Sequence, residues 1–188
     1  MRELALAVAA VQAGCWLPRL PHGELKAIGT ATESVFLDAK IPFVWRNASI
    51  KRQAKLILDN KENSCISGAY KTGPLASQAK FTDAIYSNQK FRVVTRPTLR
   101  SIKSGMSVEE LFSNRNLVLE TQFGQSLGAG LDQAIALYDP VRVVSSSDNA
   151  STIKRLLKGR IDYFIAASSD IEHQVNAGLI KPKDLRLV

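Results

Sequence analysis

The residues most suggestive of chemistry are 124–128, GQSLG, which fit the pattern G-x-S-x-G. Between a strand and a helix, the small residues of this pattern allow a tight turn that exposes the serine hydroxyl as a nucleophile. Asp162 and His173 follow Ser126 in the order serine, aspartate, histidine. One hypothesis is therefore a serine hydrolase in which Ser126 is the nucleophile.

A second interpretation makes the same loop a ligand-binding turn. Its glycines would let backbone N–H groups approach a ligand, and Ser126 would cap the following helix. A helix N-terminus offers unpaired N–H donors and the positive end of the helix dipole, which suit a carboxylate or a phosphate. His173 lies inside a predicted helix and Asp162 lies early in a predicted strand, which are poor positions for a catalytic triad. The binding turn is the favoured interpretation.

Composition restricts the class of protein without naming a function. The chain has 188 residues, 45% of them hydrophobic, which is typical of a globular protein. Its net charge of +8 is dispersed and no nucleic-acid motif accompanies it, so no nucleic-acid partner is expected. Two cysteines and two histidines argue against a disulfide framework and a Cys/His zinc site. No cofactor or metal site is predicted.

The first fifteen residues allow two interpretations. Residues 4–13 are apolar apart from Gln12, and the QAGC sequence at 12–15 is similar to a lipoprotein cleavage box. However, Gln12 stands where that box favours an aliphatic residue, and Glu3 weakens the basic start of a signal peptide. A continuous apolar run is also typical of a strand buried on both faces. The segment is thus either an export signal or a first strand, and no run is long enough to span a bilayer.

Predicted strands and helices alternate along the chain. Strands are expected at 4–11, 41–46, 64–66, 91–95, 116–121, 141–144 and 161–165, and helices at 30–38, 50–58, 108–112, 126–138, 149–157 and 168–177. Such alternation predicts an α/β fold with mainly parallel sheets. The polar stretch 96–107 is the only seam, which predicts lobes at 1–96 and 97–188. A buried thiol is favoured for Cys65 over a disulfide to Cys15.

Four segments share their order and pattern with one protein family. They are an aromatic–proline–glycine loop at 16–29, a run at 71–86 similar to "T-x-x-R … F-S-x-P-Y", a strand and loop at 117–126 similar to "V-G-V-x-x-G-T", and residues 156–163, similar to "L-x-x-G-R-V-D-A". Together they resemble the bacterial extracellular solute-binding proteins of family 3, the periplasmic receptors of ABC importers. The segment 156–163 is the most specific of the four.

The resemblance implies a two-lobed fold of the periplasmic-binding-protein type (type II), with a small polar or anionic solute bound between the lobes without catalysis. It also implies a periplasmic or extracytoplasmic location and an ABC permease or a sensor protein as partner. The residues expected to bind the solute are Trp16, Tyr70 and Thr72 from lobe one and Gly124, Gln125, Ser126 and Ser168 from lobe two.

The charged anchors of the family's amino-acid binders are missing from their usual positions. Those proteins hold the ligand carboxylate with the arginine of T-x-x-R, where this chain has Leu75. They hold the α-amino group with an acidic residue past the G-R-V-D-A strand, where this chain has Ala166, Ala167 and then Ser168. Both charged anchors for a zwitterion are missing, so standard amino-acid binding is not expected.

The family normally continues past the point where this chain ends and returns to lobe one. We therefore expect the sheet of lobe one to lack a strand, with the gap buried in a homodimer, filled by a domain-swapped element, or covered by the loop 16–29. A third functional hypothesis, the effector-binding domain of a transcription regulator, rests on analogy of fold alone.

Overall fold

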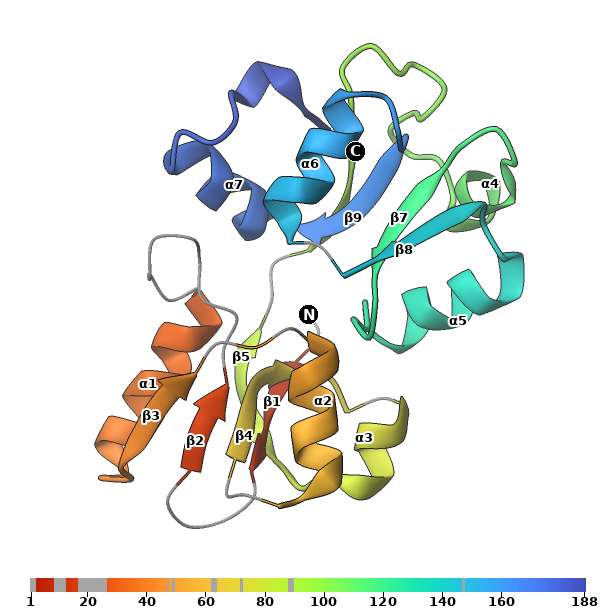
Figure 1. Cartoon of the computed structure of the whole chain (residues 1–188). Helices are drawn as coiled ribbons and strands as arrows, with labels where there is room; N and C mark the ends of the chain where they lie inside the picture. Colours follow the sequence, from red (N-terminus) through yellow and green to blue (C-terminus); the bar gives the residue numbers. More distant parts are fainter. Residues whose placement is uncertain are drawn as a thin grey trace. The chain divides into compact units, whose positions relative to one another are not determined.

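The structure is a computed structural model that describes residues 3–8, 13–16, 27–46, 48, 50–61, 64–71, 73–87, 90–146 and 148–188. The chain divides into two compact units, Met1–Asn88 and Gln89–Val188 (Figure 1). No helix in the described ranges is both long enough and apolar enough to cross a membrane.

The first unit is built on a five-stranded sheet. Its elements are β1 (Glu3–Val8), β2 (Ala13–Trp16), α1 (Ala27–Asp38), β3 (Phe43–Arg46), α2 (Ile50–Asp59), β4 (Ser64–Ala69), α3 (Gly73–Gln78) and β5 (Phe81–Ser87). The strand order is β3-β2-β4-β1-β5. Strand β2 runs parallel to β3 and β4, whereas β1 runs antiparallel to β4 and β5.

The second unit is built on a five-stranded sheet of its own. Its elements are β6 (Phe91–Thr95), α4 (Val108–Ser113), β7 (Leu119–Gln122), α5 (Ala129–Tyr138), β8 (Arg142–Ser145), α6 (Asn149–Leu157), β9 (Tyr163–Ala167), α7 (Ser168–Asn176), a 3-10 turn (Pro182–Asp184) and β10 (Arg186–Leu187). The strand order is β10-β6-β9-β7-β8. Strand β7 is parallel to β8 and β9, and β6 is antiparallel to β9 and β10.

The two sheets follow one plan. When five is added to each strand number of the first sheet, the order becomes β8-β7-β9-β6-β10, which is the order of the second sheet starting from its other edge. The parallel and antiparallel pairings also correspond. The predicted class, α/β with mainly parallel sheets, is confirmed, since only β1 and β6 run against the other strands of their sheets. The structural boundary lies at 88/89 rather than at the expected 96/97, because β6 pairs within the second sheet.

The strand expected to be missing from the first sheet is present. Strand β1 occupies the position between β4 and β5 that β6 occupies between β9 and β10. The apolar run at the start of the chain thus forms a strand over Glu3–Val8, while residues 9–12 and most of the loop 16–29 lie outside the described residues. The expectation of a free thiol at Cys65 is wrong: this residue is disulfide-bonded, and Cys15 lies opposite it in the register of β2 and β4.

Local sequence signals fix several helix ends of the second unit. The predicted capping box forms at α4, where the Glu110 N–H donates to Ser107 Oγ over 3.1 Å and the Ser107 N–H donates to Glu110 Oε2 over 2.8 Å. Asp148 caps α6 by accepting from the Ser151 N–H at 2.8 Å. Helix α5, however, begins at Ala129 with Gly128 as its N-cap, so the prediction that Ser126 caps this helix is wrong.

The segment most specific to the family resemblance has a structural role. Arg96 forms an ion pair of 2.8 Å with Asp162 and donates to the carbonyls of Leu156 and Ile161. Asp162 also accepts from the Val118 N–H at 2.9 Å. These bonds connect the end of β6, the end of α6 and the start of β9 with the segment before β7. They therefore stabilise the sheet on which the candidate site is built.

Candidate ligand-binding site

A cavity of about 350 Å³ lies in the second unit at the carboxyl end of β7, beside β8 and α5. Ligands of open α/β sheets bind at such carboxyl ends, and the volume is at the lower end of the range for small-molecule sites. Its lining residues are Glu120, Thr121, Gln122, Phe123, Gly124, Gln125, Leu127, Asp132, Ile135, Arg142, Val144, Asn149, Thr152, Phe164 and Ile165.

One wall of the cavity is formed by the sheet and α5. Arg142 and Val144 are two positions apart on β8, so their side chains lie on the same face of the sheet. Asp132 and Ile135 are three residues apart on α5 and share one side of that helix. The lining of the cavity combines apolar side chains with neutral polar ones and a few charged groups.

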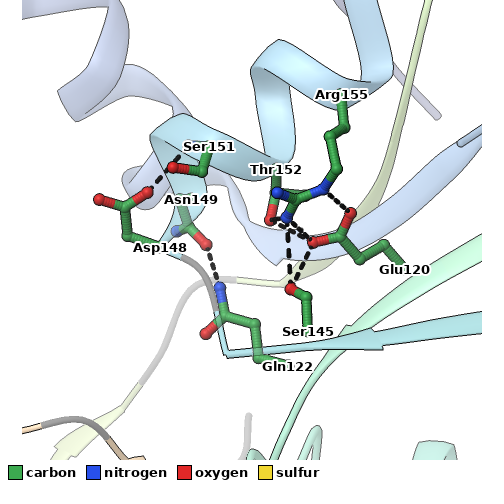
Figure 2. Close-up of polar contacts among 8 residues, drawn as sticks. All are labelled: Glu120, Gln122, Ser145, Asp148, Asn149, Ser151, Thr152 and Arg155. Atoms are coloured by element: carbon green, nitrogen blue, oxygen red, sulfur yellow. Dashed lines mark hydrogen bonds and ion pairs between the residues drawn. The ribbon is translucent and has the colours of Figure 1, made fainter. Parts of the chain in front are cut away.

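The other wall contains a fully enclosed carboxylate, Glu120 (Figure 2). The Glu120 side chain is 0% exposed, and Arg155 forms an ion pair with it. Thr152 and Ser145 each donate a hydroxyl hydrogen bond of 2.7 Å to Glu120 Oε1, and Arg155 Nε donates to Oε2 over 2.8 Å. This network joins β7, β8 and α6 directly beneath the cavity.

The Glu120 carboxyl remains charged in spite of its burial. Desolvation alone would raise its pKa, but the hydrogen bonds from Arg155, Thr152 and Ser145 outweigh it and bring the pKa below the usual 4.5. The same pairing raises the pKa of the Arg155 guanidinium. Glu120 therefore stabilises the fold and is not a proton donor to a ligand.

The lowered pKa of Glu120 predicts an acid-dependent loss of stability. A group whose pKa is lower in the folded state contributes stability above its unfolded pKa, and this contribution is lost as pH falls through the folded value. Because the usual value is 4.5, we expect the loss to begin below about that pH. Urea denaturation followed by circular dichroism from pH 7 to pH 3 should give a shallower pH dependence for Glu120→Gln than for the unaltered protein. Parallel curves would contradict the prediction.

The loop that follows β7 is fixed by bonds to β8 and α6. Gln122 Nε2 donates to Asn149 Oδ1 over 2.9 Å, and the Phe123 N–H donates to the Ser145 carbonyl over 2.7 Å. Gly124 has a φ of 76°, a left-handed conformation that glycine adopts without strain. The glycine at this position thus allows the chain to turn back over the cavity.

The Ser126 hydroxyl stabilises this loop. It donates to Asp132 Oδ2 over 2.5 Å and accepts from the Gly128 N–H at 3.0 Å, while the Leu127 N–H donates to Asp132 Oδ1 over 2.8 Å. The expected partners of a hydrolase are engaged elsewhere, since Asp162 pairs with Arg96 and His173 lies within α7. The three residues therefore do not form a triad in the described structure.

This geometry predicts that Ser126 is not a nucleophile. Incubation with a fluorophosphonate probe should leave the mass of the protein unchanged, because the Ser126 hydroxyl is hydrogen-bonded to a carboxylate, Asp132, and not to an imidazole that could act as the general base. Ser126→Ala should give the same mass spectrum as the unaltered protein. Stoichiometric labelling that disappears in Ser126→Ala would restore the hydrolase hypothesis.

The residues predicted to bind solute lie at corresponding strand ends of the two units. Gly124 and Gln125 line the cavity, Ser126 follows them in the same loop, and Ser168 begins α7 directly after β9. In the first unit, Trp16 ends β2 and the half-buried Tyr70 follows β4. Strands β2 and β4 correspond to β7 and β9 in the shared plan. Thr72 lies outside the described residues.

The family's usual anchor positions are apolar and packed here. Leu75 packs against Ile57, Ile66 and Ala69 in the core of the first unit. Ala166 and Ala167 are both buried. At these positions, therefore, no charged side chain takes the place of the family's arginine or of its acidic residue.

Other polar residues of the cavity escaped the sequence analysis. Glu120, Asp132, Arg142, Asn149 and Thr152 all line it, although no motif marks them. Only the Asp148 cap gave an indirect signal, because it fixes the start of the helix that carries Asn149 and Thr152. Within the ranges that the structure describes, no group of three or more His, Cys, Asp or Glu residues is arranged to hold a metal ion.

Comparison with known proteins gives matches among solved structures. No protein-family model matches the chain, and no curated protein matches it. An ancestral arginine-binding protein bound to arginine matches with a TM-score of 0.70 over 96% of this chain and 79% of that one, at 12% identity. The chain has the periplasmic-binding-protein fold.

Two further structures of this fold are similar. An ABC uptake transporter substrate binding protein from Streptococcus pneumoniae with bound histidine has a TM-score of 0.69 and 15% identity, over 94% of this chain and 73% of that one. A structure from a study of glutathione import through GshT and the cystine ABC importer TcyBC of Streptococcus mutans has a TM-score of 0.69 and 14% identity, over 95% and 76%. At such identities the likeness establishes the fold, which the family resemblance had predicted.

Proposed function

We propose that the protein binds a small polar solute and releases it unchanged, in transport or in sensing. The observation that carries this proposal is the cavity at the carboxyl end of β7, in a chain with the periplasmic-binding-protein fold. The similar structures are described as binding proteins for arginine and histidine and as part of glutathione import, which supports binding over catalysis. The bonds that occupy Ser126 and Asp162 are consistent with it.

The solute contacts in this proposal are the residues predicted from the sequence in each unit. Gly124, Gln125 and Ser126 contribute the loop after β7, and Ser168 contributes the start of α7. Trp16, Tyr70 and Thr72 contribute the corresponding ends of β2 and β4. The shared strand plan supports this set, because each described member lies at the carboxyl end of a corresponding strand.

The proposed setting is extracytoplasmic, with an ABC permease or a sensor protein as partner. The disulfide at Cys65 supports an oxidising compartment, since such bonds persist outside the reducing cytosol. One of the similar structures comes from work on a binding protein and its ABC importer, which supports a permease as the partner.

A thermal-shift screen tests the proposed function. The full chain is heated with amino acids, organic acids, sugars and phosphate, each at millimolar concentration. A solute that binds only the folded protein raises the melting temperature by mass action, by an amount that grows with its concentration. We expect at least one class to do so, without turnover by mass spectrometry. Conversion of the bound solute, or no shift in any class, would reject the proposal.

A further inference from the structure

Cations that are dispersed along the sequence gather at one end of the second sheet. Residues 89–188 contain fourteen Lys or Arg and ten Asp or Glu, a net charge of +4. Six exposed cations lie in three separate connections, and together we call them the basic rim: Arg100, Lys103, Lys158, Arg160, Lys181 and Lys183. Because the rim alone carries +6, the other side chains of the unit have a net charge of −2.

Strand direction places the three connections at the same end of the sheet (Figure 1). Strands β7 and β9 are parallel, and the cavity lies at the carboxyl end of β7. The turn between α6 and β9 therefore lies at the opposite end, where β9 begins. Strand β6 is antiparallel to β9 and β10, so the loop after β6 and the turn before β10 lie at that end too.

Hydrogen bonds hold the loop after β6 against the connections on either side of it. On one side, Arg96 donates to the Ile161 carbonyl over 2.6 Å, at the start of β9. On the other side, Arg186 of β10 donates to the carbonyls of Leu99 and Ile102 over 2.6 and 2.5 Å. The basic rim is thus a surface of one folded unit and does not depend on the first unit.

The acids near the basic rim neutralise little of its charge. Asp162 is paired with Arg96, which is not part of the rim. Asp184 is half-buried and accepts from the Lys181 N–H at 3.3 Å. None of the ion pairs between described residues includes a side chain of the rim. The six charges therefore produce a positive field at this end of the unit, which attracts an anionic partner.

The residue types at this end of the unit favour a lipid surface as that partner. Four of the six cations are lysines, which protein–protein interfaces tend to exclude. The segments 96–107, 157–161 and 178–185 contain no aromatic residue on which nucleic-acid bases could stack. Leu157 and Leu179 are exposed close to Lys158 and Lys181. Exposed apolar side chains beside cations are typical of proteins that lie at the headgroup boundary of a membrane.

We propose that the basic rim binds an anionic lipid surface, with Leu157 and Leu179 at the headgroup boundary. Each Lys or Arg near such a surface adds to the affinity, and the attraction falls off within a Debye length. None of the rim residues lines the cavity. Lipid binding and solute binding therefore involve separate residues, and either can be lost without the other.

Co-sedimentation of the full chain with lipid vesicles tests the proposal. One set of vesicles is phosphatidylcholine alone, and the other is equal parts phosphatidylcholine and phosphatidylglycerol. Lys158→Gln combined with Arg160→Gln removes two charges of the rim. Lys90→Gln combined with Arg92→Gln is the matched control, because it removes the same two side chains from exposed positions at the other end of the sheet. Thermal melts by circular dichroism check that both variants fold.

We expect the unaltered protein to bind the anionic vesicles and not the neutral ones. The rim variant should bind the anionic vesicles at least about tenfold more weakly, since two cations that contact the surface are lost. The control variant should stay within about threefold, because its charges lie beyond the range of the surface field. Leu179→Ser should also weaken binding. Salt at about 1 M should abolish most of the binding, since the Debye length then falls to about 3 Å.

Other results would overturn the proposal. Equal losses in the rim and control variants would mean that the overall charge, and not the rim, attracts the lipid. Equal binding to the two kinds of vesicle would exclude an electrostatic basis. Binding of polyglutamate or duplex DNA, with no binding to either vesicle, would assign the rim to an acidic protein or to nucleic acid. None of these results affects the thermal-shift test of solute binding.

Discussion

Arg155→Ala is expected to lower the free energy of unfolding by about 2–3 kcal/mol, because it leaves a buried carboxylate without its cation. Glu120 is 0% exposed at its side chain and Arg155 only 24%, so water cannot replace the lost guanidinium fully. The partial exposure of Arg155 places the effect towards the lower end of values for buried pairs. Urea denaturation at pH 7 followed by circular dichroism measures it.

Two further variants identify the cause of that loss. Lys154→Ala removes a neighbouring charge that is exposed on α6 and should change stability by no more than about 0.5 kcal/mol. In the Glu120→Gln background, Arg155→Ala should cost much less than in the unaltered protein, because the buried charge is gone. Equal costs in the two backgrounds would show that Arg155 stabilises the unit by packing and not through Glu120.

The second large effect is expected at two adjacent leucines of α6. Leu156 is 0% exposed and belongs to a core with Val94, Ile153 and Phe164, whereas Leu157 is 42% exposed. Leu156→Ala should lower the free energy of unfolding by about 3 kcal/mol, through lost burial and the cavity that remains. Leu157→Ala should change it by no more than about 0.5 kcal/mol.

This comparison tests the orientation of α6. Both substitutions make the same chemical change on the same helix, so helix propensity cancels between them. Similar losses for the two variants would mean that the helix packs on the sheet through a different face. The face matters for the site, because α6 also carries Asn149, Thr152 and Arg155.

Features encoded by neighbouring residues were predictable from the sequence. The Ser107 capping box and the Asp148 cap form as expected, because cap and partner lie within three residues of each other. The loop at 124–128 was also expected after a strand, and its glycines do allow the turn. The serine within it was misassigned as a helix cap, since its actual partner is Asp132, further along the chain.

The site itself was harder to predict, since its residues come together only in the folded sheet. Glu120 and Arg155 are 35 positions apart, and neither belongs to a motif that would join them. Asp132 and Arg142 line the same cavity from different elements, α5 and β8. The boundary between the units was expected at 96/97 but lies at 88/89 for a similar reason. Residues 91–95 precede the polar stretch 96–107, so the sequence assigned them to the first lobe, but in the fold β6 pairs with β9 of the second sheet.

The arrangement of each sheet within one continuous segment affects how unfolding is observed. Because no strand in the described part of the chain joins the sheet of the other unit, one unit can unfold without removing a strand from its neighbour. Both tryptophans of the chain, Trp16 and Trp45, belong to the first unit. Tryptophan fluorescence therefore reports on the first unit, and a variant that melts only the second would leave this signal largely unchanged. If the unfolding midpoints from fluorescence and from circular dichroism differ, the two units unfold in separate transitions. A single two-state fit does not apply in that case.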